Sequence, residues 1–314
     1  MAWEDVDVAV VGTVNLDTTI HVPRLAQRGE TVVGDVATDA VGGKAANQAV
    51  AAARQGARTA LVGCVGDDTS GDAALELLGA EPGLDVSAVG RVGGAATGRA
   101  LIAVDDAGGN TVTTSKGANA CLDDAYVDRH GRVIGDADVV LVQLGVPIEA
   151  VRAALEIARG VGTITILDPA PADDVSDELL RLVDVITPNE SEAVRLTGGR
   201  VAREHEVRDA AQTLLRRGCT SVVITLAARG AFYASATRPE GVVIAPHELD
   251  VSAVVDPTGA GDAFCGALAA AMARGADIDE ALRDATVAGA LATTVRGAAP
   301  SMPTRAAVQV ARRG

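Results

Sequence analysis

Apolar and polar residues follow two different periods along this chain. Short, nearly uninterrupted apolar runs, such as those at 7–13 and 138–144, are typical of strands that are buried on both faces of a sheet. Longer segments with a helical period follow several of these runs, for example at 45–55 and 148–159. The same patterns predict strands at 58–65, 163–167, 185–187 and 221–226 and helices at 71–78, 204–217 and 262–273. This alternation predicts an α/β fold, in which helices cover both faces of a mostly parallel sheet.

Two segments depart from the alternation. Residues 18–22 and 30–38 have the pattern of hairpin strands, and residues 97–115 have the same pattern around an Asp-Asp-Ala-Gly-Gly-Asn turn. We expect the two segments, about 15–41 and 97–115, to form a small second sheet over the main one. Because the chain has no internal repeat or linker-like stretch, residues 1–314 are predicted to form one domain with this β-rich outgrowth.

Composition narrows the functional classes. Hydrophobic residues make up 48% of the chain, which is enough for a large core, and no apolar run has the length of a membrane span. The formal net charge of −15 argues against a nucleic-acid surface, which needs a basic face. The N-terminus is acidic without an apolar signal segment, and the four cysteines are too far apart for a zinc site. We therefore expect a cytoplasmic protein that binds neither nucleic acid nor membrane.

One stretch, residues 254–264, has the clearest sign of chemistry. A Pro and two Gly residues make a sharp turn after Asp256, and an apolar helix begins near Asp262. The loop Gly259–Gly261 therefore lies at a helix N-terminus, where free N–H groups and the helix dipole favour an anion. Asp262 at such a site could take a proton from a hydroxyl that attacks a bound phosphate. The alternative is an N-capping Asp after a Gly turn.

A second Gly-rich turn precedes the first predicted helix. Gly43 and Lys44 lie in this turn, and Asn47 and Gln48 lie in the first turns of the helix, where polar side chains can reach a ligand. Asn15 and Asp17 come directly after the first predicted strand, and ligands of open α/β sheets bind beyond the carboxyl ends of strands. These residues are candidate contacts for substrate hydroxyls. The alternatives are helix capping for Asn47 and turn formation for Asn15 and Asp17.

Polar residues also follow two later strands. Asn189 and Glu192 are spaced i to i+3 at a predicted helix start, where a carboxylate could act on phosphates through Mg²⁺ and its waters. A capping pair is the alternative. Thr225 ends a strand before a predicted hairpin at 231–234, and its hydroxyl could line a nucleotide. The chain contains neither a P-loop, nor a G-x-G-x-x-G fingerprint, nor a G-x-S-x-G elbow.

Two longer motifs carry a family resemblance. Residues 42–57, GGKAANQAVAAARQGA, and 256–264, DPTGAGDAF, resemble the two signatures of the ribokinase, or PfkB, family of sugar kinases. Eight shorter segments follow the family's order, namely VVGTVNLD, RGETVVG, VGDDTSGD, SKGANA, DPAPA, VDVITPNESEA, VITLAARGA and RGAAPSMP. The resemblance covers nearly the whole chain and is strongest to the ribokinase branch. It implies a ribokinase-like three-layer sandwich with a mostly parallel central sheet and a small β-sheet lid over the sugar.

The resemblance also implies an activity and roles for individual residues. The activity is transfer of the γ-phosphoryl group of ATP to the hydroxymethyl oxygen of a pentose, with D-ribose favoured. Asp262 corresponds to the catalytic base, and Gly259, Ala260 and Gly261 correspond to the anion hole. The sugar contacts correspond to Asn15, Asp17, Gly43, Lys44, Asn47 and Asp262. The nucleotide contacts correspond to Asn189, Thr225, Gly230, Gly261 and Thr286, and the Mg²⁺-linked carboxylate corresponds to Glu192.

Family members of this type also bind a monovalent cation, usually K⁺, beside the anion hole. By resemblance its ligands would be Asp256, Thr258, Ala292, Val295, Gly297 and Ser301, several of them through backbone carbonyls. The lid often forms the dimer contact in the family, so we expect a homodimer through the lid.

Four positions depart from the family pattern. Gly145 replaces a Glu that contacts the sugar, and this change is expected to remove a hydrogen bond and open space. Pro257 replaces a usual Thr, Ala227 replaces a usual Gly of the nucleotide loop, and Asp168 stands where Asn is common. The base and the anion hole are retained, so the departures bear mainly on the identity of the sugar.

Three other functions stay open at the level of sequence. The first is a kinase of the same family for another pentose, a ketose or a nucleoside. The second is a non-catalytic sugar-binding regulator on the same fold, which would have no need of a base such as Asp262. The third is an unrelated α/β nucleotide-binding enzyme, and the missing fingerprints argue against it.

Overall fold

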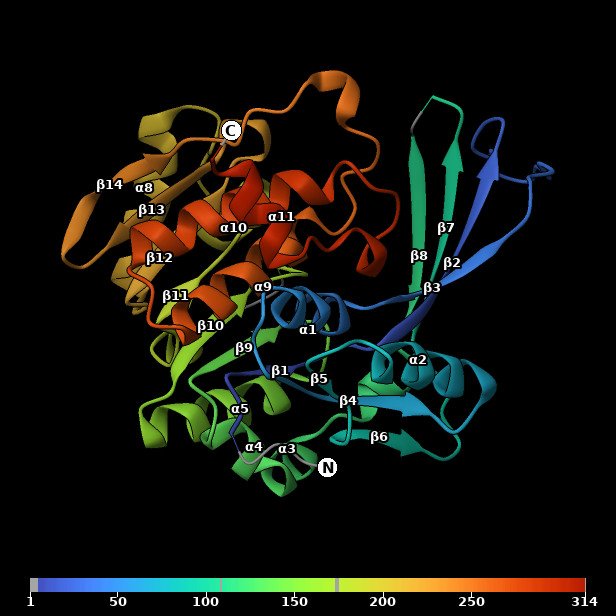
Figure 1. The fold of residues 1–314 in the computed structure, drawn as a ribbon, viewed down its shortest axis with the longest axis horizontal. Helices are drawn as coiled ribbons and strands as arrows, with labels where there is room; N and C mark the ends of the chain where they lie inside the picture. Colours follow the sequence, from blue (N-terminus) through green and yellow to red (C-terminus); the bar gives the residue numbers. More distant parts are fainter. Residues whose placement is uncertain (1–4, 108, 173–174, 314) are drawn as a thin grey trace.

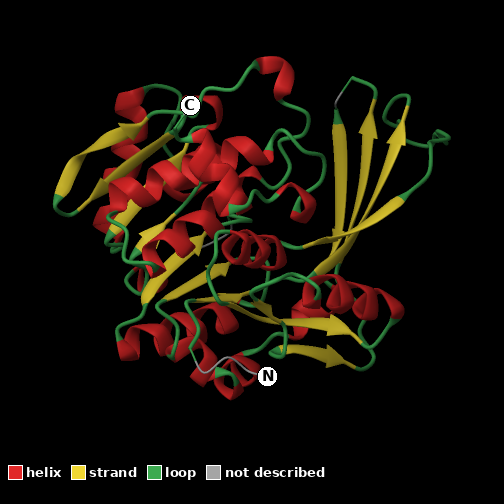
Figure 2. Ribbon diagram, viewed as in Figure 1, coloured by secondary structure: helices red, strands yellow, loops and turns green. Residues whose placement is uncertain are grey.

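A large sheet lies between two layers of helices in the computed structural model of this protein, which describes residues 5–107, 109–172 and 175–313 (Figures 1 and 2). The strands of this sheet are β1 (Val8–Val11), β4 (Thr59–Gly66), β5 (Leu84–Asp85), β6 (Val89–Val92), β9 (Val139–Gln143), β10 (Ile164–Asp168), β11 (Val185–Ile186), β12 (Ser221–Thr225), β13 (Ala231–Ser235) and β14 (Arg238–Ile244). Their order is β14-β13-β12-β11-β10-β9-β1-β4-β5, and β6 also pairs with β4. Only the pairs β12–β13 and β13–β14 are antiparallel. The predicted α/β sandwich with a mostly parallel sheet is confirmed.

The central strands are apolar on both faces because each face is covered by helices. Val8 and Val10 of β1 point into one hydrophobic core, while Ala9 and Val11 point into the other. The first core is closed by α1 (Lys44–Arg54), α2 (Thr69–Gly79), α9 (Ala260–Ala273), α10 (Ile278–Ala292) and α11 (Arg305–Ala311). The second is closed by α3 (Asp124–Arg129), α4 (Gly131–Gly135), α5 (Ile148–Val161), α6 (Asp177–Leu180), α7 (Glu190–Thr197) and α8 (Glu204–Arg217).

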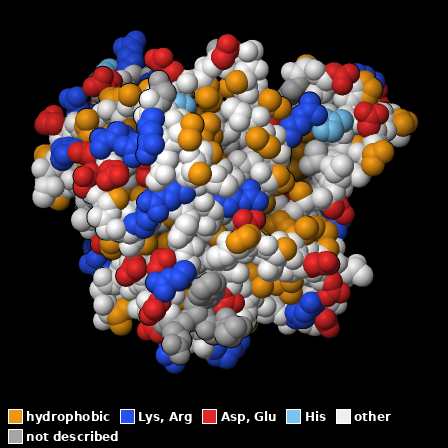
Figure 3. Space-filling model, in the orientation of Figure 1, with side chains coloured by type: hydrophobic (Ala, Val, Ile, Leu, Met, Phe, Trp, Pro, Cys, Tyr) orange, Lys and Arg blue, Asp and Glu red, His pale blue; other side chains and the backbone are white. Residues whose placement is uncertain are grey.

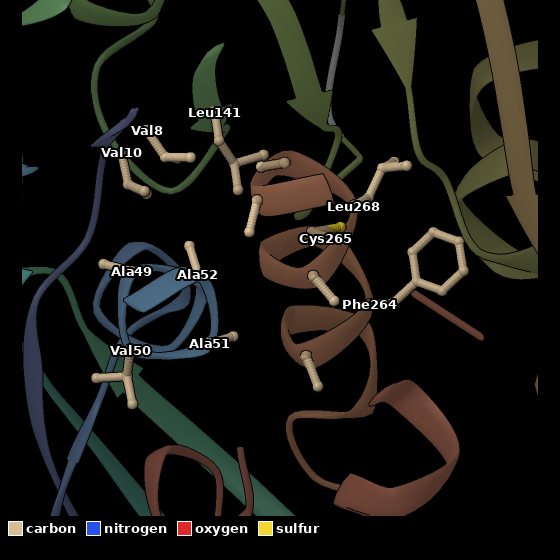
Figure 4. Packing of buried hydrophobic residues seen from close by; sticks show 14 of the residues in the cluster. Val8, Val10, Ala49, Val50, Ala51, Ala52, Leu141, Phe264, Cys265 and Leu268 are labelled. Carbon is tan, nitrogen blue, oxygen red and sulfur yellow. The ribbon is translucent and has the colours of Figure 1, made fainter. Parts of the chain in front are cut away.

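Helices α1 and α9 pack closely side by side over the sheet (Figure 4). Small side chains make this approach possible, since the part of α1 that faces α9 carries Ala51 and Ala52. Gly266 of α9 lies against it so tightly that an added Cβ would be 2.5 Å from Cβ of Ala51. Because both helices begin at the same end of the sheet, this packing brings their first turns together.

Four strands form a second, smaller sheet that projects beyond the main one (Figure 1). They are β2 (Asn15–Val22), β3 (Thr38–Gly42), β7 (Arg99–Asp105) and β8 (Asn110–Ser115), in the order β3-β2-β7-β8. The pair β2–β7 is parallel, and the pairs β2–β3 and β7–β8 are antiparallel. The expected second sheet is therefore present, built from both β-rich segments.

Two details of the first β-rich segment, residues 15–41, differ from expectation. The strand predicted at 30–38 is wrong, because residues 30–37 form an irregular segment in which the N–H of Asp35 donates to the carbonyl of His21. Val33 and Val36 produced the alternating pattern, but they are 82% and 80% exposed and pack on no core. Asn15 and Asp17 lie within β2 and not in a turn after the first strand.

Candidate active site

Asp262 is the centre of a buried polar cluster. It lies in the first turn of α9 and is only 6% exposed. The Nδ2 atom of Asn47 donates to its Oδ2 at 2.9 Å, and the Nε2 atom of Gln48 donates to its Oδ1 at 2.9 Å. A carboxylate has about four lone-pair positions, so two remain for a substrate hydroxyl. The packing of α1 on α9 thus holds the carboxylate in one orientation.

Gln48 joins this carboxylate to a second one. Its Nε2 atom also donates to Oδ2 of Asp168 at 2.7 Å, and its Oε1 atom accepts from Nε2 of Gln143 at 2.5 Å. Gln48 and Gln143 are fully buried, so water does not compete for these bonds. From the sequence, Gln48 was a candidate ligand contact in the first turns of the helix, whereas Gln143 was assigned no role. The available signal was a polar Gln143 at the end of the otherwise apolar strand β9.

Lys44 lies between the two carboxylates. Its Nζ atom is 3.5 Å from Oδ2 of Asp168 and 3.9 Å from Oδ1 of Asp262. The nearby charge of Asp168, with a smaller contribution from Asp262, raises the pKa of Lys44 against the opposing effect of burial. Burial raises the pKa of Asp168, and Lys44 partly offsets this effect. The lysine therefore carries its positive charge at neutral pH, beside the reactive carboxylate.

The start of α9 is an open anion-binding position. Gly259 is its N-cap residue, with φ 79°, and the helix begins at Ala260. The N–H groups of Gly261 and Asp262 make no backbone hydrogen bond within the described residues. A Cβ on Gly261 would meet no atom within 4 Å, so the side of the loop at Gly261 is open. Gly259–Gly261 can therefore accept an oxyanion directly beside Asp262.

The turn before α1 is shaped by close contacts with β2. A Cβ on Gly42 would lie 1.8 Å from Oδ2 of Asp17, and a Cβ on Gly43 would lie 2.6 Å from the carbonyl oxygen of Thr13. Gly43 also has φ 88°, which favours glycine. The paired glycines thus let Asp17 lie directly over the turn that leads to Lys44. Asn15 and Asp17 are i and i+2 in β2, so both project from one face of that strand.

Gly145 does not open the space expected from its sequence. A Cβ at this position would lie 2.6 Å from the methyl carbon of Thr13, so the Thr13 side chain already fills the place. The hydroxyl of Thr13 accepts from the backbone N–H of Lys44 at 3.0 Å. Gly145 is therefore linked to the Lys44 turn through Thr13, and the expectation of a gap was wrong.

The candidate nucleotide residues lie along the other half of the sheet. Asn189 and Thr225 form an isolated parallel bridge, and the carbonyl of Gly230 accepts from the N–H of Leu226 at the start of the β12–β13 turn. A Cβ on Gly230, which has φ 86°, would lie 2.1 Å from the carbonyl oxygen of Ile244. Ile244 and Thr286 line a cavity of about 790 Å³ between β14, the segment after it and α10.

The cavity has a mixed lining. Val242, Ile244, Pro246 and Val287 supply its apolar walls, and the remaining lining includes Arg238, Arg283 and Arg312. Basic side chains gather at this end of the molecule, over β14 and α10 (Figure 3). The lining also includes Glu248 and Asp279, and Arg238 is paired with Asp279, so charges of both signs border the apolar walls. The cavity is large enough for a nucleoside.

Asn189 and Glu192 form a capping box at the start of α7. Oδ1 of Asn189 accepts from the N–H of Glu192 at 2.9 Å, and Oε2 of Glu192 accepts from the N–H of Asn189 at 2.8 Å. The capping alternative is therefore present in the structure. Burial first and the charge of Asp168 second raise the pKa of Glu192, while its bond with the backbone of Asn189 and the charge of Lys44 lower it.

Comparisons with known proteins identify the family. A profile described as pfkB family carbohydrate kinase matches residues 5–305. This chain belongs to the pfkB family of carbohydrate kinases. It is 39% identical to a ribokinase of Haemophilus influenzae over 296 residues, which are 94% of this chain and 95% of that relative. A ribokinase of Staphylococcus aureus is 37% identical over 298 residues, which are 94% of this chain and 96% of that relative. The fold is similar to that of Arabidopsis thaliana ribokinase complexed with ribose and ATP, with a TM-score of 0.91, 30% identity and 99% of each chain covered.

In this pfkB family chain, three of the residues predicted for a monovalent cation, Asp256, Thr258 and Gly297, are joined by hydrogen bonds close to the start of α9. Oδ1 of Asp256 accepts from the N–H of Thr258, and its Oδ2 accepts from the N–H of Gly297, both at 2.9 Å. Burial acts to raise the pKa of Asp256, but these bonds outweigh it, and the net shift is downward. The N–H of Val295 donates to the carbonyl of Ala292.

Ser301 joins the same region from the short helix η4 (Ala299–Ser301). Its hydroxyl donates to the carbonyl of Ala298 at 2.8 Å, and a Cβ on Gly259 would lie 3.0 Å from Cα of Ala298. The described residues contain no group of three or more His, Cys, Asp or Glu side chains that could hold a metal ion.

No helix within the described part of the chain has the length and hydropathy needed to cross a membrane.

Proposed function

We propose that this pfkB family protein transfers the γ-phosphoryl group of ATP to the 5-hydroxymethyl oxygen of D-ribose. One observation carries the proposal: Asp262 is held by Asn47 and Gln48 beside the free N–H groups that begin α9. A general base and an anion-binding position within one helical turn suit in-line attack of an alcohol on a phosphoryl group. The ribokinases to which the chain is similar support the choice of sugar.

The buried polar groups suit a substrate rich in hydroxyls. Oδ1 of Asn47 is buried and has no hydrogen-bond partner within the described residues, although its Nδ2 is bound to Asp262. An unsatisfied buried acceptor is costly, and a substrate hydroxyl that donates to it would remove the cost. Asp17 offers a second acceptor, since the N–H of Ala100 binds only its Oδ1. A sugar supplies donors for both.

The residues of this chain divide the reaction between them. Asp262 takes the proton of the hydroxymethyl group as its oxygen attacks the γ-phosphorus. The N–H groups of Gly261 and Asp262 stabilise the charge that develops on the transferred phosphoryl group, and the ammonium of Lys44 adds positive charge beside the same position. Mg²⁺, when bound through water to Glu192, would neutralise the phosphates. The cavity beside Thr286 would hold the nucleoside of ATP.

A monovalent cation is part of this proposal. The carboxylate of Asp256 holds the segment before Gly259 against Gly297. A K⁺ ion bound there by the carbonyls of the two segments would order the anion-binding loop without contacting the substrate. We assign its ligands to the residues given by the resemblance, Asp256, Thr258, Ala292, Val295, Gly297 and Ser301.

The four-stranded sheet is proposed to act as a lid and a dimer contact. β2 carries Asn15 and Asp17 at its base, and the outer parts of the sheet expose Leu101 and Val112, each 53% exposed. Exposed aliphatic side chains on a projecting sheet favour burial against a second copy of the chain. We also propose a cytoplasmic location, because ATP is supplied there.

A substrate panel tests the proposed activity. Purified protein would be assayed for ADP release with ATP, Mg²⁺ and K⁺ and with D-ribose, 2-deoxy-D-ribose, D-fructose or adenosine as acceptor. We expect the highest kcat/KM with D-ribose. A higher value with another acceptor would overturn the choice of sugar, and ADP release with none would overturn the kinase activity.

A further inference from the structure

Asn119 is a buried residue that touches the sugar-binding strand from a distant part of the chain. It lies in the short helix η1 (Gly117–Cys121) and is 1% exposed. Its Oδ1 atom accepts from the backbone N–H of Val14 at 2.8 Å. Its Nδ2 atom donates to the carbonyl of Val14 at 3.2 Å and to Oδ1 of Asn15 at 2.9 Å. Both polar atoms of its side chain are therefore engaged with Val14 and Asn15.

These contacts determine which way both amides point. A backbone N–H can only donate, so the group of Asn119 that faces the N–H of Val14 must be its oxygen. Its NH₂ group then faces Asn15, and the group of Asn15 that meets it must be an oxygen. The NH₂ group of Asn15 is consequently left on the other side of the amide. This chain of donors and acceptors determines the orientation of both amides.

The surroundings support the same orientation. Burial raises the pKa of Asp17, while the N–H of Ala100 first and the side chain of Asn15 second act in the opposite direction. An NH₂ group of Asn15 on the side of Asp17 is consistent with this direction. Gly98 closes the other side, since a Cβ there would lie 2.1 Å from Nδ2 of Asn119 and 2.3 Å from Oδ1 of Asn15. The pair of amides is thus enclosed by backbone, and neither amide can turn without losing bonds.

We propose that Asn119 is a positioning residue for the sugar: it holds Asn15 so that its NH₂ group, and not its oxygen, faces the substrate beside Asp17. The substrate side of β2 then presents one donor, Asn15, next to one acceptor, Asp17. A sugar hydroxyl that accepts from Asn15 is selected over a hydrogen at the same carbon. This inference rests on the proposed function, because Asn15 is placed at the sugar there.

A comparison of sugars and variants tests it. The kcat/KM of the wild type and of Asn119→Ala would be measured with D-ribose and with its 2-deoxy and 3-deoxy analogues. For the wild type, we expect kcat/KM to be about tenfold or more lower with one of the deoxy analogues than with ribose, as in sites built to bind a hydroxyl. For Asn119→Ala, kcat/KM with the same analogue should be lower than with ribose by about threefold or less, because Asn15 is free to turn. The KM for ATP should stay within about twofold of the wild-type value.

A merely structural role would give a different result. If Asn119 only holds η1 to β2, Asn119→Ala would lower kcat/KM by the same factor for ribose and for each analogue, and this outcome would overturn the proposal. Leu122→Ala is the control, because Leu122 ends η1, is fully buried and has no contact with Asn15 among the hydrogen bonds of the described residues. It should lower the melting temperature and leave the ratio between sugars at the wild-type value.

A second variant covers the case in which Asn119→Ala does not fold. Asn119→Asp has the same shape and keeps an acceptor for the N–H of Val14, but loses the donor to Asn15. We expect the same reduced discrimination, and full wild-type discrimination would contradict the proposal. If the wild type prefers a sugar other than ribose, the ribose assignment alone is overturned, since the same comparison then applies to the analogues of that sugar.

Discussion

The Cα atom of Gly145 faces the methyl group of Thr13, so closely that a Cβ at 145 would lie 2.6 Å from it. Thr13 in turn caps the N–H of Lys44 through its hydroxyl. The methyl group of Thr13 therefore occupies the space that a side chain at 145 would need, and the sizes of the two side chains depend on each other. A larger residue at 145 requires a smaller one at 13.

The first prediction concerns this pair. Gly145→Glu alone should destabilise the protein by about 1–3 kcal/mol, as overpacking does, and raise the KM for ribose by displacing Thr13. Thr13→Ser removes the methyl and keeps the hydroxyl that caps Lys44. The double variant Thr13→Ser/Gly145→Glu should then recover stability and have a lower KM for ribose than Gly145→Glu. Thermal unfolding and ribose kinetics of the four proteins would decide, and a double variant no better than Gly145→Glu would refute the coupling.

The catalytic role of Asp262 has a simple test. Asp262→Asn should fold normally but phosphorylate ribose at least about 100-fold more slowly, the usual scale for a lost general base. Asp277→Asn is a matched control, because Asp277 is the N-cap of α10 and lies outside the polar cluster. Asn caps a helix about as well as Asp, so the control should keep wild-type kcat. Near-full turnover in Asp262→Asn would mean that another group accepts the proton.

The monovalent-cation site predicts ion-dependent activity. Turnover should be higher in K⁺ than in Na⁺ or tetramethylammonium at equal ionic strength, because only an ion of suitable size can be held by the carbonyls behind Gly259. Asp256→Asn should reduce this difference, since Asp256 joins Thr258 to Gly297. Equal rates in the three salts would remove the cation from the account.

A pH dependence of stability follows from Asp68, the N-cap of α2. The hydroxyl and the N–H of Thr97 and the N–H of Gly71 all donate to its carboxylate, at 2.6, 2.9 and 2.8 Å. The Thr97 hydroxyl is the largest cause that lowers the pKa of Asp68 below its ordinary 3.8. A lowered folded-state pKa gives stability that is present above the unfolded-state pKa and lost as pH falls through the folded-state value.

Melting temperatures would show this effect. The wild type should melt above Asp68→Asn at pH 7, and the difference should shrink below about pH 4, near the unfolded-state pKa of Asp. Asp123→Asn is the control, since Asp123 also caps a helix but accepts only from the N–H of Tyr126. Its difference from the wild type should change less with pH. A difference for Asp68→Asn that grows as pH falls would contradict the sign.

Much of the fold could be predicted because local pattern and tertiary environment agree. The helix predicted at 204–217 is α8, with the same bounds, and the strand predicted at 138–144 is β9 shortened by its ends. The pattern failed at 30–38, where alternating valines face solvent. Alternation predicts a strand only if another strand supplies hydrogen-bond partners, and the sequence does not show which segments will pair.

The site was predicted in part for the same reason. Asp262, Lys44 and Asn47 lie in glycine-rich turns at helix starts, which sequence motifs mark clearly. Gln143 and Asn119 were missed because their importance depends on partners 95 and 105 residues away. Gln48 was expected to face a ligand, but its link between Asp168 and Asp262 depends on partners 120 and 214 residues away. The contact between Gly145 and Thr13 was missed for the same reason, and it reversed the expectation of an open gap.

The identity of the product tests the central claim most directly. The wild-type protein would be incubated with ATP, Mg²⁺, K⁺ and D-ribose, and the product examined by phosphorus–proton correlation NMR. We predict one phosphosugar, with the phosphorus coupled to the two protons on C5 of ribose, and one ADP formed for each phosphosugar. Formation of ADP without a phosphosugar, or a phosphate ester on the oxygen of a carbon other than C5, would contradict the assignment of Asp262 as the base for the hydroxymethyl group.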